Sequence, residues 1–291
     1  MIESHLAIAN PAVHPGASGA GASAGTLTVL ARLLEARTGQ QIASSRAWRL
    51  DVALKPLLRD REIDTLDQLV DTLLDGSDHG LGDRIIDALV NGESSFFRDQ
   101  PVFDTIAQAL TAIAPDHRGR VWSAGCATGQ EPLSLAMMFA EAAGEGSPPE
   151  LVATDVSEAA LARARSGRYN QFEIQRGLPV RRMMRWFDSD GTDWTAKPEL
   201  TRLIQYRQSN LVTDPAPGGR FDIILCRNVL FYLAAGAKAK VFASLAAALR
   251  PGGLLVLGAG ETVIGQTDLF MPSTRYRGFY EHTDTKRRIK G

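Results

Sequence analysis

A chain of 291 residues with an apolar fraction of 44% is long enough for two domains of ordinary size. Its net charge of −1 gives no overall attraction to nucleic acid or an acidic membrane, and two cysteines do not support a disulfide framework or a cysteine-rich metal site. The N-terminus has no basic leader, and no segment is an unbroken apolar stretch of spanning length. We therefore expect a soluble, unexported protein of the cytoplasm.

The N-terminal part divides into a tail and a helical unit. Residues 1–26 are rich in Ala, Gly, Ser and Pro, a composition typical of a disordered tail. Apolar residues then recur at helical spacing from Leu27 to Gly39. Three more helical segments are predicted at about residues 44–59, 65–74 and 80–90, which gives a helical domain over 27–90. Its first two segments are basic, and this pattern fits either ordinary solvated faces or a surface for an acidic partner.

Residues 91–118 form a predicted linker with a connecting helix. The helix is expected to open at residues 99–101, where a proline lies in the first turn. Phe96 and Phe97 are expected to pack between the two units. For Arg98 the residues alone leave two alternatives open, a surface ion pair and a functional site.

Residues 120–155 set the pattern of the third part, residues 119–284. They predict a strand, a loop of small residues, a helix and a second strand that ends at Asp155. This is the first half of a nucleotide-type site in an open α/β sheet, where ligands bind beyond the carboxyl ends of the strands. Gly125 can adopt positive φ, and an acid at the next strand end suits a ribose hydroxyl pair. A turn or capping role for Asp155 is the less favoured alternative.

The remaining elements complete a mostly parallel, Rossmann-like sheet. A helix is expected after Ser157, which has the character of an N-cap. Residues from about Tyr169 to Thr201 interrupt the alternation of strands and helices and predict a small insertion or hairpin laid over the main sheet. The other expectations are strands at 203–206, 221–227 and 254–257, a helix at 237–248, a turn at 250–253 and a closing antiparallel strand near 274–282.

Polar residues at four strand ends are predicted to meet in one crevice. They are the 125–129 loop with Glu131, then Asp155, residues 209–211, and Arg227 with Asn228. The loop, GCATG, lacks the three-glycine fingerprint of dinucleotide enzymes, and the chain has no phosphate-binding GK[ST]. An adenosine without phosphates remains, which points to S-adenosylmethionine.

The same residues belong to a series of longer motifs. In chain order these are NGESSFFRDQPVF, WSAGCATGQEP, VATDVSEAALARARSGRY, SNL, FDIILCRNVLFYL and LRPGGLLVLGAGE. With them the sequence from about Leu27 to Tyr280 resembles the CheR-type chemoreceptor glutamate O-methyltransferases, which act on methyl-accepting chemotaxis proteins. The resemblance implies a class I S-adenosylmethionine methyltransferase fold, preceded by a small all-helical domain that meets the receptor and carrying a β-subdomain at about 177–204.

The resemblance also implies the site. S-adenosylmethionine contacts of the family match Ser94, Arg98, Glu131, Asp155, Asn210, Leu211, Arg227 and Asn228, and the strand–loop pattern adds Gly125. The tyrosine near the transferred methyl matches Tyr232, so Arg98 and Tyr232 are the expected catalytic pair. The chain departs from the family pattern at Gly92, Ser94, Gln130 and Ala259, where Asn, Thr, Glu and His are usual.

The implied reaction needs no base. A glutamate carboxyl, with an ordinary pKa of about 4.3, is ionised at neutral pH, and no histidine or metal-ligand spacing falls in the motifs. We expect a monomer that uses S-adenosylmethionine, releases S-adenosyl-L-homocysteine, binds no metal, and acts on the cytoplasmic helical bundle of a chemoreceptor. Two alternatives stay open: a non-catalytic module that binds either compound and engages a partner through its helical domain, and a methyltransferase for another acceptor.

Overall fold

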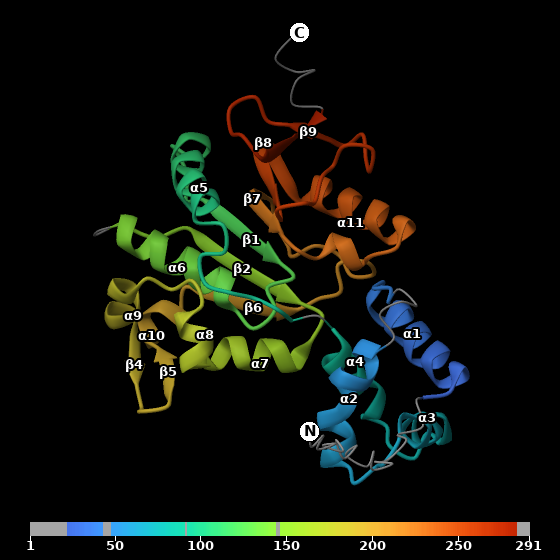
Figure 1. Cartoon of the computed structure of the whole chain (residues 1–291). Helices are drawn as coiled ribbons and strands as arrows, with labels where there is room; N and C mark the ends of the chain where they lie inside the picture. The colour runs from blue at the N-terminus through green and yellow to red at the C-terminus, as the bar shows by residue number, and fades with distance from the viewer. Residues whose placement is uncertain (1–21, 43–47, 91, 144–145, 284–291) are drawn as a thin grey trace, which may run out of the picture.

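The computed structural model describes residues 22–42, 48–90, 92–143 and 146–283. Figure 1 shows a helical unit at the N-terminal end of the chain, a central sheet with helices on its faces, and a small second sheet at one side. Of the expected tail, residues 1–21 lie outside the described residues, whereas residues 24–26 belong to the first helix.

The helical unit consists of four amphipathic helices around a core of leucine and isoleucine side chains. Its core contains Leu30, Leu54 and Leu81, all with no exposed surface. These apolar positions recur at helical spacing, so the helices form where that spacing predicted them. The four are α1 (Ala24–Thr38), α2 (Trp48–Asp60), α3 (Leu66–Asp75) and α4 (Leu81–Leu89).

The main sheet has seven strands in the order β6-β2-β1-β7-β8-β10-β9. The first five are parallel, and β10 is antiparallel to both of its neighbours. That order of parallel strands is the order of a doubly wound fold, and it confirms the expected class I methyltransferase architecture. The strands are β1 (Arg120–Ala124), β2 (Glu150–Asp155), β6 (Ile204–Gln208), β7 (Phe221–Cys226), β8 (Leu249–Leu257), β9 (Phe270–Pro272) and β10 (Phe279–His282).

Helices cover both faces of this sheet. Successive residues of β1 face opposite sides, so Val121 packs in one apolar cluster and Trp122 in another. Helices α5, α6 and α7 contribute to the Val121 cluster, and α11 contributes to the Trp122 cluster. Their bounds are α5 (Gln100–Ile113), α6 (Gln130–Ala143), α7 (Glu158–Ser166) and α11 (Ala235–Ala248).

A three-stranded antiparallel sheet in the order β3-β5-β4 lies beside the main domain. It begins at Arg168, close to the interruption predicted from about Tyr169 and earlier than the β-subdomain that the resemblance implied at 177–204. Phe96 packs edge-on against Tyr169 and Phe187 of this sheet, with ring centroids 5.1 and 5.7 Å away, so it is a core residue as expected but packs within the second unit and not between the two units. The elements are β3 (Arg168–Asn170), α8 (Gln171–Gln175), α9 (Val180–Trp186), β4 (Phe187–Ser189), β5 (Asp193–Ala196) and α10 (Pro198–Thr201).

Two expectations about the C-terminal part need correction. The turn predicted at residues 250–253 does not separate two elements, because β8 runs through it as a bulge. Phe221 pairs with Leu249 and Ile223 with Leu254, so the four residues between 249 and 254 are accommodated opposite Asp222. The sequence also gave no indication of β9, a three-residue edge strand.

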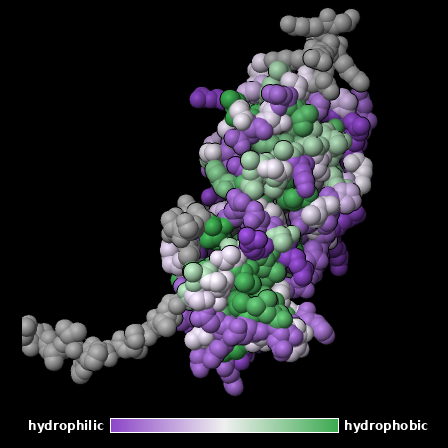
Figure 2. Space-filling view, turned by 90° about the vertical axis from the view of Figure 1, so that its right-hand side faces the viewer, coloured by the Kyte–Doolittle hydropathy of each residue, from purple (hydrophilic) through white to green (hydrophobic). Residues whose placement is uncertain are grey.

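The surface in Figure 2 mixes hydrophilic and hydrophobic residues. Within the described ranges, no helix combines the length and the apolar character needed to cross a membrane.

Candidate active site

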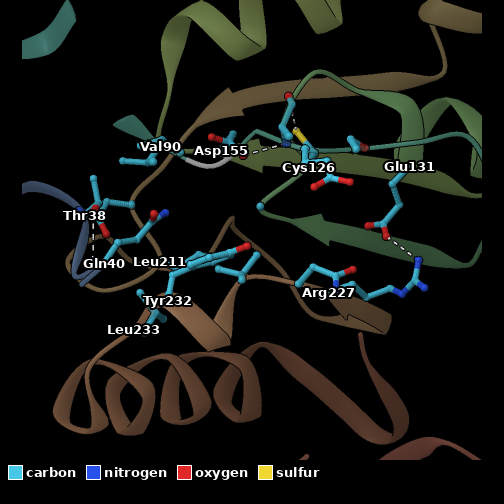
Figure 3. A pocket seen from close by; sticks show the side chains of 18 of the residues that line it. Thr38, Gln40, Val90, Cys126, Glu131, Asp155, Leu211, Arg227, Tyr232 and Leu233 are labelled. Atoms are coloured by element: carbon cyan, nitrogen blue, oxygen red, sulfur yellow. Dashed lines mark hydrogen bonds and ion pairs between the residues drawn. The ribbon is translucent and has the colours of Figure 1, made fainter. Parts of the chain in front are cut away.

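A pocket opens beyond the carboxyl ends of the parallel strands, where the strand order reverses at β1. It holds about 880 Å³ of empty space, part of it open to solvent. In Figure 3, Glu131 and Arg227 point toward each other at one end, and Thr38 and Gln40 lie at the other. All the predicted site residues line it: Ser94, Arg98, Gly125, Glu131, Asp155, Asn210, Leu211, Arg227, Asn228 and Tyr232. Their roles toward a ligand stay predictions.

The glycine loop is fastened to the second strand. The N–H groups of Gly125 and Cys126 donate to the Thr154 carbonyl at 2.8 and 2.9 Å. Gly125 has φ 79°, and a Cβ there would lie 2.4 Å from Cγ2 of Val229. Only glycine accommodates both the left-handed backbone and this contact, so the loop can approach the segment that follows β7.

Asp155 holds the loop and faces the pocket at the same time. Its Oδ2 accepts from the Ala127 N–H at 2.8 Å, and its Oδ1 accepts from the Ser157 N–H at 3.0 Å. The turn role that the sequence left open is therefore real, but an ionised carboxylate has about four acceptor sites, and further hydrogen bonds remain possible. Burial raises the pKa of Asp155, and the neighbouring Asp87 carboxylate adds to the rise.

Arg227 is buried and binds protein groups. Its side chain is 2% exposed, and it donates to Glu131 Oε2 at 3.1 Å, to the Arg98 carbonyl at 3.0 Å and to the Asp99 carboxylate. Glu131 also accepts from the Ser123 hydroxyl at 2.7 Å. Arg227 thus ties the end of β7 to α6 and to the segment before α5, and Glu131 extends the contact to Ser123 of β1. Its Nε is buried without a hydrogen-bond partner among the described residues.

Arg98 differs, because its guanidinium makes no hydrogen bond or ion pair with any described residue. The side chain is half-buried at the pocket. It lies between Phe97 and Asp99, whose φ angles of 46° and 63° place both in the left-handed region. The Phe97 N–H donates to Ser134 Oγ at 3.0 Å, so this turn is hydrogen-bonded to α6. Arg98 therefore forms no ion pair within the described residues, and its functional role stays a prediction.

The helical unit supplies part of the pocket wall. Thr38 and Gln40, at and just beyond the end of α1, line it. The Asn210 amide donates to the Arg37 carbonyl at 2.7 Å, and the Gln41 N–H donates to the Tyr232 carbonyl at 2.6 Å. Residues on both sides of the pocket are therefore hydrogen-bonded to the N-terminal unit.

A second polar contact joins the two units behind Asp155. The Ser157 hydroxyl donates to Asp87 of α4 at 2.6 Å and also accepts from the Ala160 N–H at 3.0 Å as the N-cap of α7. The expected N-cap role of Ser157 is confirmed. Asp155 is thereby linked through Ser157 to the helical unit.

Known proteins share the pattern of this chain over most of its length. The family described as "CheR methyltransferase, SAM binding domain" matches residues 92–278. The chain is 32% identical over 245 residues to chemotaxis protein methyltransferase Cher2 of Pseudomonas putida, covering 81% of this chain and 89% of that protein. It is 35% identical over 246 residues to chemotaxis protein methyltransferase 1 of Vibrio cholerae, covering 82% and 90%.

The chain belongs to the CheR methyltransferase family. The resemblance drawn from the motifs is confirmed, and S-adenosylmethionine is the cofactor of this SAM-dependent methyltransferase. Solved structures with some similarity include glycopeptide N-methyltransferase MtfA complexed with sinefungin, 15% identical with a TM-score of 0.37 over 65% of this chain and 66% of that one. Another is SAM-bound CalS10 of Micromonospora echinaspora, 22% identical with a TM-score of 0.34 over 57% and 52%.

The residues of this CheR pocket fit the cofactor. Asp155 is a buried carboxylate of the kind that a ribose diol requires, and Arg98 brings to the same pocket a guanidinium without a hydrogen bond to a described residue. Cys126 and Cys226 are both free and buried, and burial raises their pKa well above the ordinary value, so they behave as small apolar side chains. Among the described residues there is no cluster of metal-ligating side chains.

Sequence reasoning missed several residues of the CheR site. Thr38 and Gln40 come from the helical unit, and no local motif points from there to the pocket. Glu261 was also missed, although it closes the LRPGGLLVLGAGE motif; its carboxylate binds the backbone beside Asn228. A glutamate just past a strand end, in a motif otherwise made of small and apolar residues, was the available signal.

Proposed function

We propose that this CheR-family protein methylates glutamate side chains of chemoreceptors. The observation that carries the proposal is the uncommitted Arg98 guanidinium, which lines the same pocket as Asp155 and Tyr232. Arg98 makes no hydrogen bond or ion pair with a described residue, although after Arg176 it adds to lowering the pKa of the Glu93 carboxyl, and a cation so placed is suited to an anionic acceptor. The names of the curated relatives, chemotaxis protein methyltransferases, support a chemotaxis substrate.

We assign some residues of the pocket to binding the cofactor and others to holding the pocket wall. Asp155, Asn210 and Leu211 are positioned to bind an adenosine, and Ser94 and Gly125 to border it. Arg227 and Glu131 neutralise each other, so we assign them to holding the wall and the Arg98 backbone in place. S-adenosylmethionine supplies an electrophilic methyl group when bound.

Arg98 and Tyr232 would orient the acceptor carboxylate for an in-line approach. The acceptor is already ionised at neutral pH, so catalysis consists mainly of alignment. Arg98 would use part of its guanidinium fork, because an ion pair that is too tight would stabilise the ground state as much as the transition state.

The helical unit offers a surface for the protein substrate. Trp48, Val52, Lys55 and Arg59 are exposed and follow each other at three- and four-residue spacing, so they form one stripe along α2. Beside α2, a small groove lined by Arg49 and Gln41 extends to Tyr232. An apolar and basic stripe on the helix that also borders this groove suits an acidic helical bundle. On this proposal the protein works as a monomer in the cytoplasm on the cytoplasmic part of the receptor.

Labelled methyl transfer tests this function. The purified protein, S-adenosylmethionine with a labelled methyl group, and a receptor cytoplasmic fragment should give label that is released by mild base, as a carboxyl methyl ester is. A fragment in which the acceptor glutamates are replaced by glutamine should take up no label. Label that resists base would indicate another acceptor and contradict the proposal.

Calorimetry with S-adenosyl-L-homocysteine separates the enzyme from a non-catalytic binding module. Binding without methyl transfer to any receptor fragment would favour the module. The departures Gly92 and Ala259 had kept that alternative open, but neither residue lines the pocket. A Cβ at Gly92 would meet no atom within 4 Å, so the position has room for a larger side chain.

A further inference from the structure

Glu261 lies just past the end of β8 and binds the segment that carries Asn228 and Tyr232. The residue is 9% exposed. Its Oε2 accepts from the N–H groups of Asn228 at 2.7 Å and Gly258 at 2.8 Å, and its Oε1 accepts from the Leu230 N–H at 2.8 Å. One carboxylate therefore joins the carboxyl ends of the neighbouring strands β7 and β8.

The backbone around Asn228 and Leu230 leaves N–H groups that require an acceptor outside the local chain. Asn228 has φ 61°, so the chain leaves the strand conformation directly after Arg227 and enters the short helix η2 (Leu230–Tyr232). The first N–H groups of a helix have no partner within it, and an anionic acceptor suits them. Within the described part of the chain, no basic side chain forms an ion pair with Glu261. Its charge is held by backbone amides.

Gly258 makes the close approach possible. A Cβ at this position would lie 2.8 Å from the Asn228 N, from its Nδ2 and from Glu261 Oε2. Any side chain there would push the carboxylate and Asn228 apart. A glycine and a glutamate of the same motif thus maintain one set of hydrogen bonds.

The segment held by Glu261 contacts both parts of the pocket. Val229 packs against the glycine loop, with its Cγ2 at the place where a side chain on Gly125 would begin. Tyr232 ends η2 at the pocket, and its N–H donates to the Val229 carbonyl at 3.2 Å. A shift of this segment would move a cofactor-side residue and the acceptor-side tyrosine together.

We propose that Glu261 is a positioning residue for methyl transfer, which acts through the backbone of residues 228–232 on Asn228 and Tyr232. The kinetic part of this proposal rests on the proposed function, whereas its effect on the backbone and on cofactor affinity does not. Glu261 touches neither cofactor nor acceptor in this assignment.

Hydrogen exchange of the cofactor-free protein tests the backbone role. Glu261→Gln keeps the size of the side chain but replaces one acceptor by an NH₂ group that faces an N–H donor. At least one of the Asn228, Leu230 and Gly258 amides should exchange about tenfold faster than in the wild type. Unchanged protection of all three amides would overturn the proposal.

Glu281→Gln is the matched control. Glu281 is a buried glutamate on β10 that is 6% exposed and accepts from the Ser273 hydroxyl at 2.6 Å and Arg275 Nε at 3.3 Å. It does not line the pocket. This variant should leave the exchange of the three amides, and the affinity for S-adenosyl-L-homocysteine, as they are in the wild type.

Binding and kinetics test the consequence for the site. Glu261→Gln should weaken S-adenosyl-L-homocysteine binding about tenfold and lower kcat about 30-fold, with a smaller change in the KM of the receptor. In a Tyr232→Phe background the loss of kcat should shrink to about threefold, since both changes act on the same residue. Equal losses in the two backgrounds would overturn the proposal. A wild type without turnover would instead refute the proposed function and leave the exchange and binding results to decide on Glu261.

Gly258→Ala is a second variant that keeps the Glu261 carboxylate. It tests the proposal even if Glu261→Gln does not fold. The added methyl group would force Asn228 and Glu261 apart, so it should reproduce the faster exchange and the weaker binding. Wild-type exchange and affinity in this variant would overturn the proposal as well.

Discussion

The segments around Arg98 and Arg227 both border the pocket and both contain residues in the left-handed region, yet the two arginines have different roles. Arg227 is 2% exposed in its side chain and bound to Glu131, Asp99 and the Arg98 carbonyl. Arg98 is half-buried and leaves its guanidinium uncommitted within the described structure. The comparison teaches that residue type alone does not assign a site role, because the partners already present decide what an arginine can still bind.

Removal of Arg227 should have the largest effect, and it should act on stability. Arg227→Met would leave the Glu131 carboxylate, whose side chain is 14% exposed, without its cation, which costs about 3–5 kcal/mol of unfolding free energy. Urea unfolding measures this loss. The control is Arg163→Met, which breaks an exposed pair with Glu173 and should cost about 0–1 kcal/mol. Equal losses in the two variants would contradict the structural role of Arg227.

Removal of Arg98 should act on turnover instead. Arg98→Ala should lower kcat/KM for methyl transfer about 100-fold, or about 2.7 kcal/mol, because a charge-assisted contact to the acceptor is lost. The unfolding free energy should change by less than about 0.5 kcal/mol, as is usual where no protein partner is lost. Arg202→Ala, an exposed arginine outside the pocket, serves as the control. Turnover at the wild-type rate in Arg98→Ala would refute the assignment.

The hydroxyl of Tyr232 should contribute less than the charge of Arg98. Tyr232→Phe should lower kcat about tenfold, or about 1.4 kcal/mol, and should leave the affinity for S-adenosyl-L-homocysteine within about twofold. Steady-state kinetics and calorimetry separate the two quantities. Tyr280→Phe, on β10 and outside the pocket, should change neither. A large loss of cofactor affinity would instead place the tyrosine hydroxyl on the cofactor.

The smallest expected effect is a pH dependence of stability that arises from the Asp155 carboxyl. Burial and then Asp87 raise its pKa above the ordinary 3.8, so the folded protein keeps this proton at a pH where the unfolded chain has lost it. The stability that the proton contributes is present at low pH and is lost as the pH rises through the raised pKa.

Cofactor affinity should change in the opposite direction. Protonated Asp155 accepts fewer hydrogen bonds, so S-adenosyl-L-homocysteine should bind about twofold more weakly when the pH equals the raised pKa, and more weakly still below it. Calorimetry across the acid range measures the dependence. Asp155→Asn should remove it, and Asp87→Asn should move it to lower pH. A dependence that persists in Asp155→Asn would assign it to another group.

Much of the scaffold followed from local pattern. The all-apolar run of β7 predicted a strand buried on both faces, and Ser157 before an apolar helix predicted an N-cap. The bulge at residues 250–253 could not be predicted from local pattern, because a proline and two glycines are equally typical of a turn. Only pairing with Phe221 and Ile223 of β7 shows that the strand continues.

The strand ends were predictable as a site because the carboxyl ends of parallel strands meet at one edge. The sequence by itself therefore determined the sheet, the crevice and Asp155, whereas Arg98 and Tyr232 were predicted through the resemblance to the CheR family; all three line the pocket. Only the tertiary structure shows that Arg227 forms an ion pair with Glu131 and that Glu261 accepts hydrogen bonds from the ends of β7 and β8. It also shows that the end of α1 lines one end of the pocket. These contacts join segments that are distant in the chain, 173 positions apart in the bond from Asn210 to Arg37, and local propensity carries no information about such partners.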